Sequence, residues 1–322
     1  MTRKKIGIIG GAGYTGGELI RLLVNHPLVE IAFVQSESQA GKNVVEIHAD
    51  LLGELDQKFV KSYDKQVDLI FLCVAHGAAT EIVAQLPETV KIIDLSADFR
   101  LSSDANRPFV YGLPELNKSA IATAQNIANP GCFATSIQLA LLPLAAQQRL
   151  TSPIHINSTT GSTGAGKSLS SSSHFSWRQN NLSAYKAFTH QHLSEISKSL
   201  QSLQANFVEP IHMIPQRGSF TRGILSAICL ETDLKIEELT HLFESYYANA
   251  PFVHLSPTNI DLKQVINTNK CLLYLEKHEN QLLIVSIIDN LLKGASGQAM
   301  QNMNLLFGFE ETIGLKLKPS AF

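Results

Sequence analysis

This sequence has no large excess of positive or negative charge, no long apolar run and no closely spaced pair of cysteines. Charged residues make up 17% of the 322 residues and the formal net charge is −2, so nothing favours nucleic acid as the main partner. No run of about 18 apolar residues occurs, which argues against a membrane-spanning helix. The apolar part of the first residues, MTRKKIGIIGGAG, is too short and too rich in glycine for a signal peptide.

The four cysteines are scattered, and none belongs to a C-x-x-C pair. This spacing predicts neither a metal site nor a disulfide framework, and it fits a reducing, cytoplasmic compartment. Cys73, Cys229 and Cys271 each lie in an apolar, strand-like run, so we expect buried thiols that pack as small hydrophobic side chains. Cys132 has different neighbours and is treated separately below.

What the chain does contain is 44% hydrophobic residues, enough for packed cores, in a length that allows two domains. Up to about residue 130, short apolar runs alternate with helical stretches, which predicts a parallel sheet with helices on both faces. After the tetrapeptide NPGC at 129–132, a helical run precedes longer β-rich runs. These predict a mixed or antiparallel sheet in a second domain, and the segment from Gly297 is helical again.

A glycine-rich motif follows the first predicted strand and opens a helix in IGIIGGAGYTGGELIRLL. Gly10, Gly13 and Gly16 have the spacing G-x-x-G-x-x-G, in which glycines allow a tight turn and a close approach of the backbone to a pyrophosphate. With Tyr14 and Thr15 of the same turn, these residues predict a dinucleotide site.

The second predicted strand ends in QSESQAGK, at the place where dinucleotide folds bind the ribose. Ser36 and Ser38 could accept a 2′-phosphate, with Lys42 supplying positive charge. Glu37 could hold the ribose hydroxyls instead. These residues therefore leave both NADP and NAD open.

A second phosphate signature occurs in GSTGAGKS at 161–168, which fits the P-loop pattern letter for letter. A P-loop must lead straight into a helix, but here it is followed by LSSSSHFS, a flexible and serine-rich stretch. We therefore do not expect nucleotide hydrolysis. Either the loop's backbone amides approach an anionic substrate, or the loop is only a solvated tip.

Cys132 stands directly before the helical run FATSIQLALLPL. A sulfur at a helix N-terminus lies near the helix dipole and free N–H groups, which stabilise a thiolate. The same amides could hold an oxyanion that forms beside the sulfur. The position makes Cys132 a candidate nucleophile, with a packing role as the alternative.

A thiolate enzyme also needs an acid or base, and 11 histidines are present. His190 and His192 in AFTHQHLSEI form the most suggestive pair, of which we expect only one to face the site. His76, after a strand, and His212 are the other candidates. A dinucleotide site and an activated cysteine together indicate hydride transfer at an acyl carbon bound to sulfur, as in aldehyde or acyl-phosphate oxidoreduction.

Eight motifs occur in an order that resembles the N-acetyl-γ-glutamyl-phosphate reductases, relatives of aspartate-semialdehyde dehydrogenase. They are GGAGYTGGELIRLL, IDLSADFRL, YGLPELN, NPGCFAT, GSTGAGK, THQHLSEI, IPQRGSFTRGI and IDNLLKGASGQAMQNMNLLFG, the last being the most specific. The resemblance covers nearly the whole chain.

The resemblance implies a Rossmann NADP-binding domain of residues 1–131 and 298–322, and an α+β catalytic and dimerisation domain of residues 132–297 with a mixed sheet. The implied reaction is the NADPH-dependent reduction of an N-acyl-glutamyl 5-phosphate to the semialdehyde with release of phosphate, in arginine biosynthesis. The implied partners are this small acyl-phosphate substrate and further copies of the chain, as a dimer or tetramer.

The resemblance also implies residue roles. Cys132 matches the catalytic cysteine, and the histidine motif falls on His190 and His192, with His192 favoured as acid/base. The loop GSTGAGK would lie beside the active site. The implied substrate-binding residues are Arg100, Ser162, Gly164 and Arg222, the arginines for the carboxylate or the phosphate.

Two departures from the family pattern occur. The family usually has S-R where this chain has Ser36-Glu37, which removes one partner for a 2′-phosphate. The usual H-R-H-T-P-E-I is H-Q-H-L-S-E-I here. An enzyme for aspartyl phosphate and a redox sensor that binds a dinucleotide without turnover remain the alternatives, and the sequence does not distinguish an acetyl from a succinyl substrate.

Overall fold

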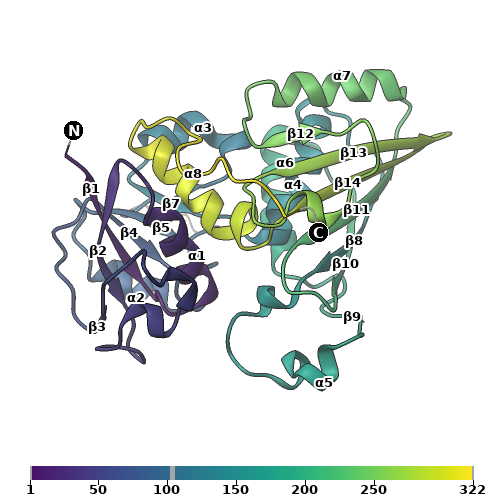
Figure 1. Ribbon diagram of the computed structural model, residues 1–322. Coiled ribbons are helices and arrows are strands. Elements are labelled where there is room, and N and C mark those ends of the chain that lie inside the picture. Colours follow the sequence, from purple (N-terminus) through teal and green to yellow (C-terminus); the bar gives the residue numbers. More distant parts are fainter. Residues whose placement is uncertain (1, 102–105, 321–322) are drawn as a thin grey trace. The chain divides into compact units, whose positions relative to one another are not determined.

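The computed structural model describes residues 2–101 and 106–320 (Figure 1). The chain forms two compact units, Met1–Pro130 with Ala295–Lys316 and Gly131–Gly294 with Leu317–Phe322. Residues 317–320 thus belong to the second unit, although we expected the first domain to keep the whole segment from 298. Leu315 is the last buried side chain of the first unit. Residues 321 and 322 lie outside the described part.

The first unit contains a seven-stranded sheet with the order β3-β2-β1-β4-β5-β7-β6, in which all neighbouring strands are parallel. The strands are β1 (Lys4–Ile9), β2 (Val29–Gln35), β3 (Phe59–Val60), β4 (Leu69–Leu72), β5 (Lys91–Asp94), β6 (Val110–Tyr111) and β7 (Asn126–Ala128). The strand order reverses at β1, which lies between β2 and β4. In such doubly wound sheets, ligands bind at the carboxyl ends of the strands at this reversal. The predicted Rossmann arrangement is confirmed.

Helices and short turns of the first unit connect these strands. They are α1 (Tyr14–Leu23), η1 (Val44–Glu46), η2 (Ala49–Leu51), α2 (Ala79–Ala84), α3 (Pro114–Thr123) and α8 (Gly297–Leu306). α1 buries an apolar face that includes Leu19, Ile20 and Leu23, as its sequence pattern predicts. α8 contacts both α1 and α3, so the segment after residue 294 completes the first unit.

α8 is unusual because four of its buried side chains are polar amides, those of Gln298, Gln301, Asn302 and Asn304. Asn302 donates from Nδ2 to the carbonyl of Gly112 at 2.8 Å and to Oδ1 of Asn129 at 3.1 Å. Asn304 donates to the carbonyl of Ile313 at 3.0 Å. The amides therefore bond loop backbone that would otherwise be buried without partners, which explains why a helix of low apolar content is fully covered.

The second unit contains a seven-stranded mixed sheet with the order β12-β13-β14-β11-β8-β10-β9. The strands are β8 (Ile154–Thr160), β9 (Ser183–Ala184), β10 (Ile211–Arg217), β11 (Ile224–Glu231), β12 (Val253–Leu255), β13 (Cys271–His278) and β14 (Gln281–Ile288). β8 and β10 are parallel, as are β12 and β13, and the remaining neighbours are antiparallel. The predicted mixed sheet is confirmed.

One face of this sheet is covered by α4 (Cys132–Ala146), which packs against β11 and β14, while α6 (His192–Leu203) and α7 (Ile236–Tyr247) pack against α4 (Figure 1). α4 is therefore enclosed by neighbours, which is why its sequence is apolar nearly all round. The remaining elements are η3 (Ser162–Ala165), η4 (Ser171–Ser173), α5 (Phe175–Arg178), η5 (Leu262–Gln264) and the π-helix η6 (Leu292–Ser296).

The other face of the mixed sheet is more exposed and corrects one prediction. Cys229 is exposed, although we expected a buried thiol, whereas Cys271 is buried and Cys73 is intermediate. Side chains alternate along a strand, so Ile228 and Leu230 of β11 face α4 and Cys229 between them faces outward. The apolar run around Cys229 predicted a strand, but it did not show which side chains would lie on the covered face of the sheet.

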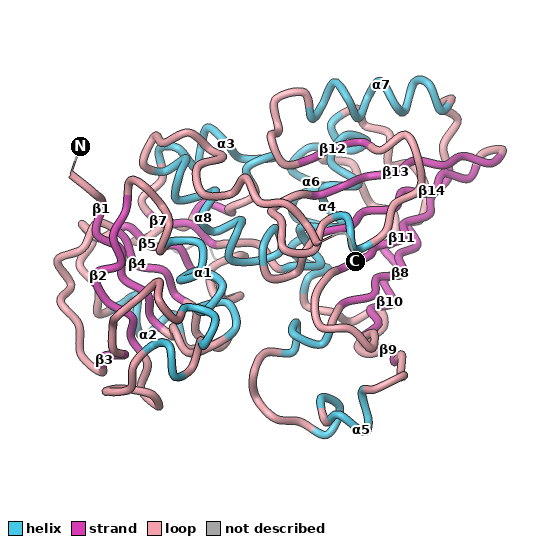
Figure 2. Tube along the Cα trace, in the orientation of Figure 1, coloured by secondary structure: helices cyan, strands magenta, loops and turns pink. Residues whose placement is uncertain are grey.

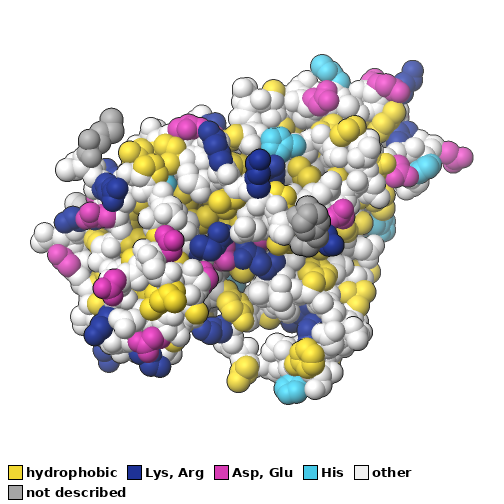
Figure 3. All heavy atoms as spheres, in the orientation of Figure 1, with side chains coloured by type: hydrophobic (Ala, Val, Ile, Leu, Met, Phe, Trp, Pro, Cys, Tyr) yellow, Lys and Arg dark blue, Asp and Glu magenta, His cyan; other side chains and the backbone are white. Residues whose placement is uncertain are grey.

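Residues 161–191 form an excursion between β8 and α6 that contains only short helices and the two-residue strand β9 (Figure 2). Apolar side chains are exposed in the part of the chain that contains α5 (Figure 3), among them Leu169 and Phe175. Among the described residues, no helix combines the length and apolarity that a membrane span requires.

Candidate active site

Cys132 is the first residue of α4, as the sequence predicted. Gly131 is the N-cap residue, with an extended backbone (φ −70°, ψ 150°), and the helix runs 15 residues from Cys132. The Cys132 side chain is partly buried rather than sealed in the core. A Cβ added to Gly294 would lie 2.8 Å from Cβ of Cys132, so the π-helix η6 packs closely on the cysteine. A helix start and a tight neighbour thus fix the position of the sulfur.

His192 and Glu195 lie one turn apart at the start of α6 and both contact the start of α4. Oε2 of Glu195 accepts a hydrogen bond from the backbone N–H of Gly131 at 3.0 Å, and Oε1 lies 3.9 Å from Nε2 of His192. A Cβ on Gly131 would overlap the His192 imidazole. Both side chains are buried, so the residue before Cys132 is held between a carboxylate and an imidazole.

His190 also belongs to this cluster, contrary to the expectation that only one of the two histidines would face the site. It precedes α6, so the helical spacing on which that expectation rested does not apply to it. Nδ1 of His190 accepts a hydrogen bond from the N–H of His192 at 3.2 Å, and the ring centroids are 4.5 Å apart. Burial, with a smaller effect of Lys186, lowers the pKa of His190 to about 4. His190 is therefore neutral near pH 7.

Two residues of the cluster were missed by the sequence analysis. The Tyr185 ring lies 5.9 Å from the His190 ring. Burial raises the pKa of Tyr185 to about 12, and the negative charge of an ionised Cys132 contributes to that increase. Glu195 could have been found from its spacing of three residues after His192, which places both on one helix face. Tyr185 follows a two-residue strand in an irregular segment and carried no local signal.

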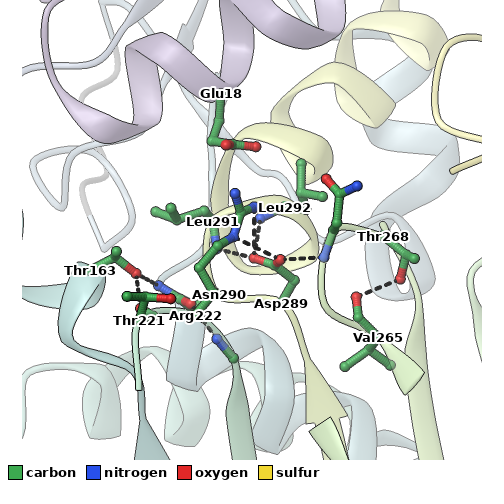
Figure 4. Close-up of polar contacts among 12 residues, drawn as sticks. Glu18, Thr163, Thr221, Arg222, Val265, Thr268, Asp289, Asn290, Leu291 and Leu292 are labelled. Atoms are coloured by element: carbon green, nitrogen blue, oxygen red, sulfur yellow. Dashed lines mark hydrogen bonds and ion pairs between the residues drawn. The ribbon is translucent and has the colours of Figure 1, made fainter. Parts of the chain in front are cut away.

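Arg222 and the GSTGAGK loop occupy another part of the second unit (Figure 4). Arg222 donates to both carboxylate oxygens of the fully buried Asp289, from Nε at 3.0 Å and from Nη2 at 3.2 Å. Asn290 donates to Oγ1 of Thr163 at 3.0 Å. Ser162 begins η3, and the N–H groups of Ser162 and Gly164 donate to backbone carbonyls. These two amides are already bonded within the protein, so neither of them is available to a ligand.

The loop also departs from a P-loop in its course. The helix that follows Gly161 is a four-residue 3₁₀ helix, and Gly166 then takes a left-handed conformation with φ +79°. GSTGAGKS thus leads into a 3₁₀ turn, whereas a P-loop requires an α-helix N-terminus at this place.

The remaining candidates lie elsewhere. Arg100, buried in the first unit, donates from Nε to the carbonyl of Asn129 at 2.9 Å and from Nη2 to that of Leu95 at 3.0 Å, and so supports the backbone that leads to Cys132. His76 is exposed and accepts a hydrogen bond from the N–H of Ala97. His212 stacks on His155 on the exposed face of the mixed sheet, away from α4.

The glycine motif of the first unit has a geometry that fits a dinucleotide. Gly10 has φ +80°, and a Cβ there would overlap the Cys73 carbonyl, while a Cβ on Gly16 would lie 2.7 Å from Cα of Gly11. Gly13, the N-cap of α1, has only the Gly10 carbonyl oxygen within 4 Å of an added Cβ, at 3.8 Å. Two glycines thus serve the turn, and the third leaves open space at a helix N-terminus, where a pyrophosphate binds.

Next to this motif, Tyr14 is 40% exposed and Thr15 accepts a hydrogen bond at its carbonyl from Ser296. At the end of β2, Ser36 is buried, Ser38 is exposed and Lys42 donates to Gln39 at 3.0 Å. Glu37 pairs with Lys61 at 3.5 Å in an exposed ion pair. The negative charge of Glu37 is therefore partly balanced by a neighbouring lysine.

Comparison with protein-family models matches the two units separately. Residues 5–124 match the NAD binding domain of semialdehyde dehydrogenases, and residues 132–290 match the semialdehyde dehydrogenase dimerisation domain. The dinucleotide site and the capacity for homo-oligomer formation are thus properties of the matched family.

Curated relatives cover nearly the entire chain. The N-acetyl-gamma-glutamyl-phosphate reductase of Bacteroides thetaiotaomicron is 56% identical over 321 residues, which span 99% of each chain. The protein of the same name from Flavobacterium johnsoniae is 55% identical over 322 residues, 98% of this chain and 99% of that one.

Solved structures share the fold at low identity. Aspartate semialdehyde dehydrogenase II from Vibrio cholerae, complexed with ASA, superposes with a TM-score of 0.73 at 18% identity, covering 96% of this chain and 99% of that one. Aspartate semialdehyde dehydrogenase with NADP from Candida albicans gives 0.69 at 17%, covering 94% and 98%.

Proposed function

The chain belongs to the N-acetyl-γ-glutamyl-phosphate reductase family, and we propose on this premise that Cys132 forms the acyl-enzyme of the family reaction. The reaction reduces an N-acyl-glutamyl 5-phosphate to the semialdehyde with release of phosphate, in arginine biosynthesis. The observation that carries the assignment is the position of Cys132 at the start of α4, with His192 and Glu195 against the preceding residue.

Cys132 attacks the acyl carbon as a thiolate, and the bond from that carbon to the phosphate oxygen breaks, which leaves a thioester. The N-terminal amides of α4 favour the thiolate and the oxyanion that forms beside it. A nicotinamide dinucleotide held at the glycine motif of the first unit would supply the hydride for the thioester carbon. The carbon–sulfur bond then breaks, which releases the aldehyde and returns the sulfur to Cys132.

His192 is the acid/base group of this proposal. Its Nε2 lies against Gly131 and 3.9 Å from Glu195, whose carboxylate orients the imidazole and stabilises its protonated form. His192 takes the proton of the Cys132 thiol and later returns it. His190 is less suited, because a pKa of about 4 keeps it neutral and its Nδ1 accepts a backbone hydrogen bond.

The cofactor is NADPH, bound by Gly10, Gly13 and the start of α1, with Ser36, Ser38 and Lys42 toward the 2′-phosphate. The ion pair of Glu37 with Lys61 supports this choice, because it offsets the carboxylate that would otherwise repel a phosphate. Matching of residues 132–290 to a dimerisation domain supports a homo-oligomer, which we propose to be a dimer or a tetramer. The proposed compartment is the cytoplasm, where thiols stay reduced.

The test follows phosphate-dependent reduction of NADP⁺ by N-acetylglutamate 5-semialdehyde. We expect Cys132→Ser to lower turnover by at least about 1,000-fold, because the hydroxyl is a far weaker nucleophile, and to leave NADPH affinity unchanged. Cys229→Ser is the matched control, since this thiol is exposed on the outer face of the sheet, and it should keep full activity. Substantial turnover by Cys132→Ser would refute the covalent mechanism.

The same assay with N-succinylglutamate semialdehyde and aspartate semialdehyde, and with NAD⁺ in place of NADP⁺, identifies the acyl group and the cofactor. Higher kcat/KM with aspartate semialdehyde than with either N-acyl substrate would overturn the proposed substrate class.

A further inference from the structure

The substrate of the proposed function carries a carboxylate that needs a cationic partner, and the two arginines expected for anions are already engaged. Arg222 has both carboxylate oxygens of Asp289 as acceptors. Arg100 is buried and donates to the carbonyls of Asn129 and Leu95. A guanidinium that already bonds a buried carboxylate or backbone carbonyls has less to offer a ligand than one with open donors.

Arg217 differs from both. It is the last residue of β10, and its guanidinium carbon lies 4.7 Å from the centroid of the Tyr185 ring. Its Nε is buried and has no hydrogen-bond partner within the protein. Within residues 2–101 and 106–320, no carboxylate forms an ion pair with Arg217. A buried donor without an acceptor is unfavourable unless a ligand supplies one.

A second guanidinium reinforces the positive charge at this place. Arg178 is buried and donates from Nη1 to the backbone carbonyl of Arg217 at 2.6 Å. Burial lowers the pKa of Arg178, and the charge of Arg217 lowers it further. Two cations are thus held close together at the end of β10, and a bound anion would relieve their repulsion.

Tyr185 connects these cations with the nucleophile. Its backbone N–H donates to the carbonyl of Pro215 at 3.0 Å, which places the tyrosine beside the end of β10. On its other side the ring meets His190, whose ring in turn meets Phe133, the neighbour of Cys132, at 5.4 Å. Cys132 and Arg217 both act electrostatically on the Tyr185 hydroxyl. A series of ring contacts through Tyr185, His190 and Phe133 therefore connects Arg217 with the start of α4.

We propose that Arg217, which lies over the Tyr185 ring beside Arg178, binds the α-carboxylate of the N-acyl-glutamyl substrate. This inference rests on the proposed function. Both the carboxylate and the phosphate are oxyanions that a guanidinium binds well. The α-carboxylate is four bonds from the carbon that Cys132 attacks, whereas the phosphorus is two bonds away. A cation that is connected to the start of α4 only through a series of ring contacts fits the more distant group.

The experiment compares two aldehydes that differ only in that carboxylate: N-acetylglutamate 5-semialdehyde and 4-acetamidobutanal. In Arg217→Gln we expect kcat/KM for the first to fall on the order of 100-fold, mostly through KM, because a charged hydrogen-bond pair is lost. For 4-acetamidobutanal the variant and the parent should have equal kcat/KM. The KM for phosphate should not change, and Arg217→Lys should recover part of the loss.

Arg149→Gln is the matched control, because Arg149 forms only an exposed pair with Asp233 at 3.7 Å, and it should behave as the parent. Equal losses with both aldehydes, or a rise in KM for phosphate, would overturn the carboxylate assignment. Should Arg217→Gln fail to fold, Arg217→Lys takes its place. The carboxylate assignment would also be overturned if this variant and the parent had the same ratio of kcat/KM for the two aldehydes. A parent enzyme inactive on every semialdehyde refutes the proposed function itself, which separates the two failures.

Discussion

The two units of the chain each begin a helix at a glycine, and the comparison shows how one local motif serves two purposes. Gly13 before α1 and Gly131 before α4 both have an extended backbone, with φ −80° and −70°, and neither helix start has a side-chain cap. Around Gly13 an added Cβ would find its nearest neighbour at 3.8 Å, whereas at Gly131 it would overlap the His192 imidazole.

The two glycines differ in what fills the space beside them. At Gly13 the missing side chain leaves space for a ligand that approaches the amides of α1, which a pyrophosphate does in dinucleotide folds. At Gly131 the space is taken by a protein side chain, so the helix start serves Cys132 and His192 instead. Glycine at a helix start therefore does not by itself distinguish a phosphate site from a nucleophile site; the neighbour brought by the tertiary fold does.

Among the substitutions that test this comparison, Gly131→Ala should have the largest effect on activity. The new methyl group would overlap the imidazole of His192, which is the end of a side chain and can turn aside while the backbone stays in place. Displacing the acid/base group by about 1 Å costs on the order of 100-fold in rate. We expect kcat to fall by that factor, in steady-state assays, with little change in the thermal unfolding midpoint.

An unchanged kcat in Gly131→Ala would show that His192 does not need its place against Gly131. A fall in kcat accompanied by a large loss of thermal stability would show instead that the glycine is required for the fold, and the comparison with Gly13 would then fail.

Gly13→Ala is the matching change in the first unit, with a smaller expected effect. The methyl group meets no atom closer than 3.8 Å, and φ −80° suits alanine, so stability should not change. The methyl would occupy space that the cofactor phosphates need, so NADPH should bind roughly tenfold more weakly, or about 1.4 kcal/mol. Fluorescence titration measures the affinity, and the rate of Cys132 alkylation by iodoacetamide, which should be unchanged, serves as the control.

An unchanged NADPH affinity in Gly13→Ala would contradict the view that the open space at α1 belongs to the ligand. So would a loss of thermal stability equal to that of a Gly16→Ala variant, whose methyl would press on the Gly11 backbone.

The same contrast explains which parts of the structure could be predicted from the sequence. The glycine turn, α1 and the start of α4 at Cys132 depend on neighbours within a few residues, and all were predicted correctly. The side chains of the cluster at the start of α4 come from residues 185–195, far along the chain from Cys132. Tyr185 and Arg217 come together because β9 pairs with β10, with Arg217 opposite Ser183, and a two-residue strand has no periodicity to detect.

The predictions for Cys229 and for the pair His190 and His192 were wrong for a related reason. The apolar run around Cys229 indicated a strand but not which face would be covered, because that depends on α4 packing on one side only. The expectation for His190 and His192 assumed that both were helical, whereas α6 begins at His192. A shift of helix start by two residues was enough to bring both rings into one cluster.

The smallest expected effect is on the pH dependence of stability. The imidazole cluster that fills the space at Gly131 includes His190, which is buried. The pKa of this histidine is lowered from 6.5 to about 4, mainly by burial, so the unfolded chain binds more protons than the folded chain between these values. Stability is therefore lost as the pH falls from about 6.5 to 4. His190→Gln should make the unfolding midpoint fall less over this range, whatever its value at pH 8. His241→Gln, at an exposed position of α7, should keep the parent slope. If the unfolding midpoint of His190→Gln and that of the parent depended equally on pH, His190 would not be held neutral. The space beside Gly131 would then be accessible to solvent, as the space beside Gly13 is.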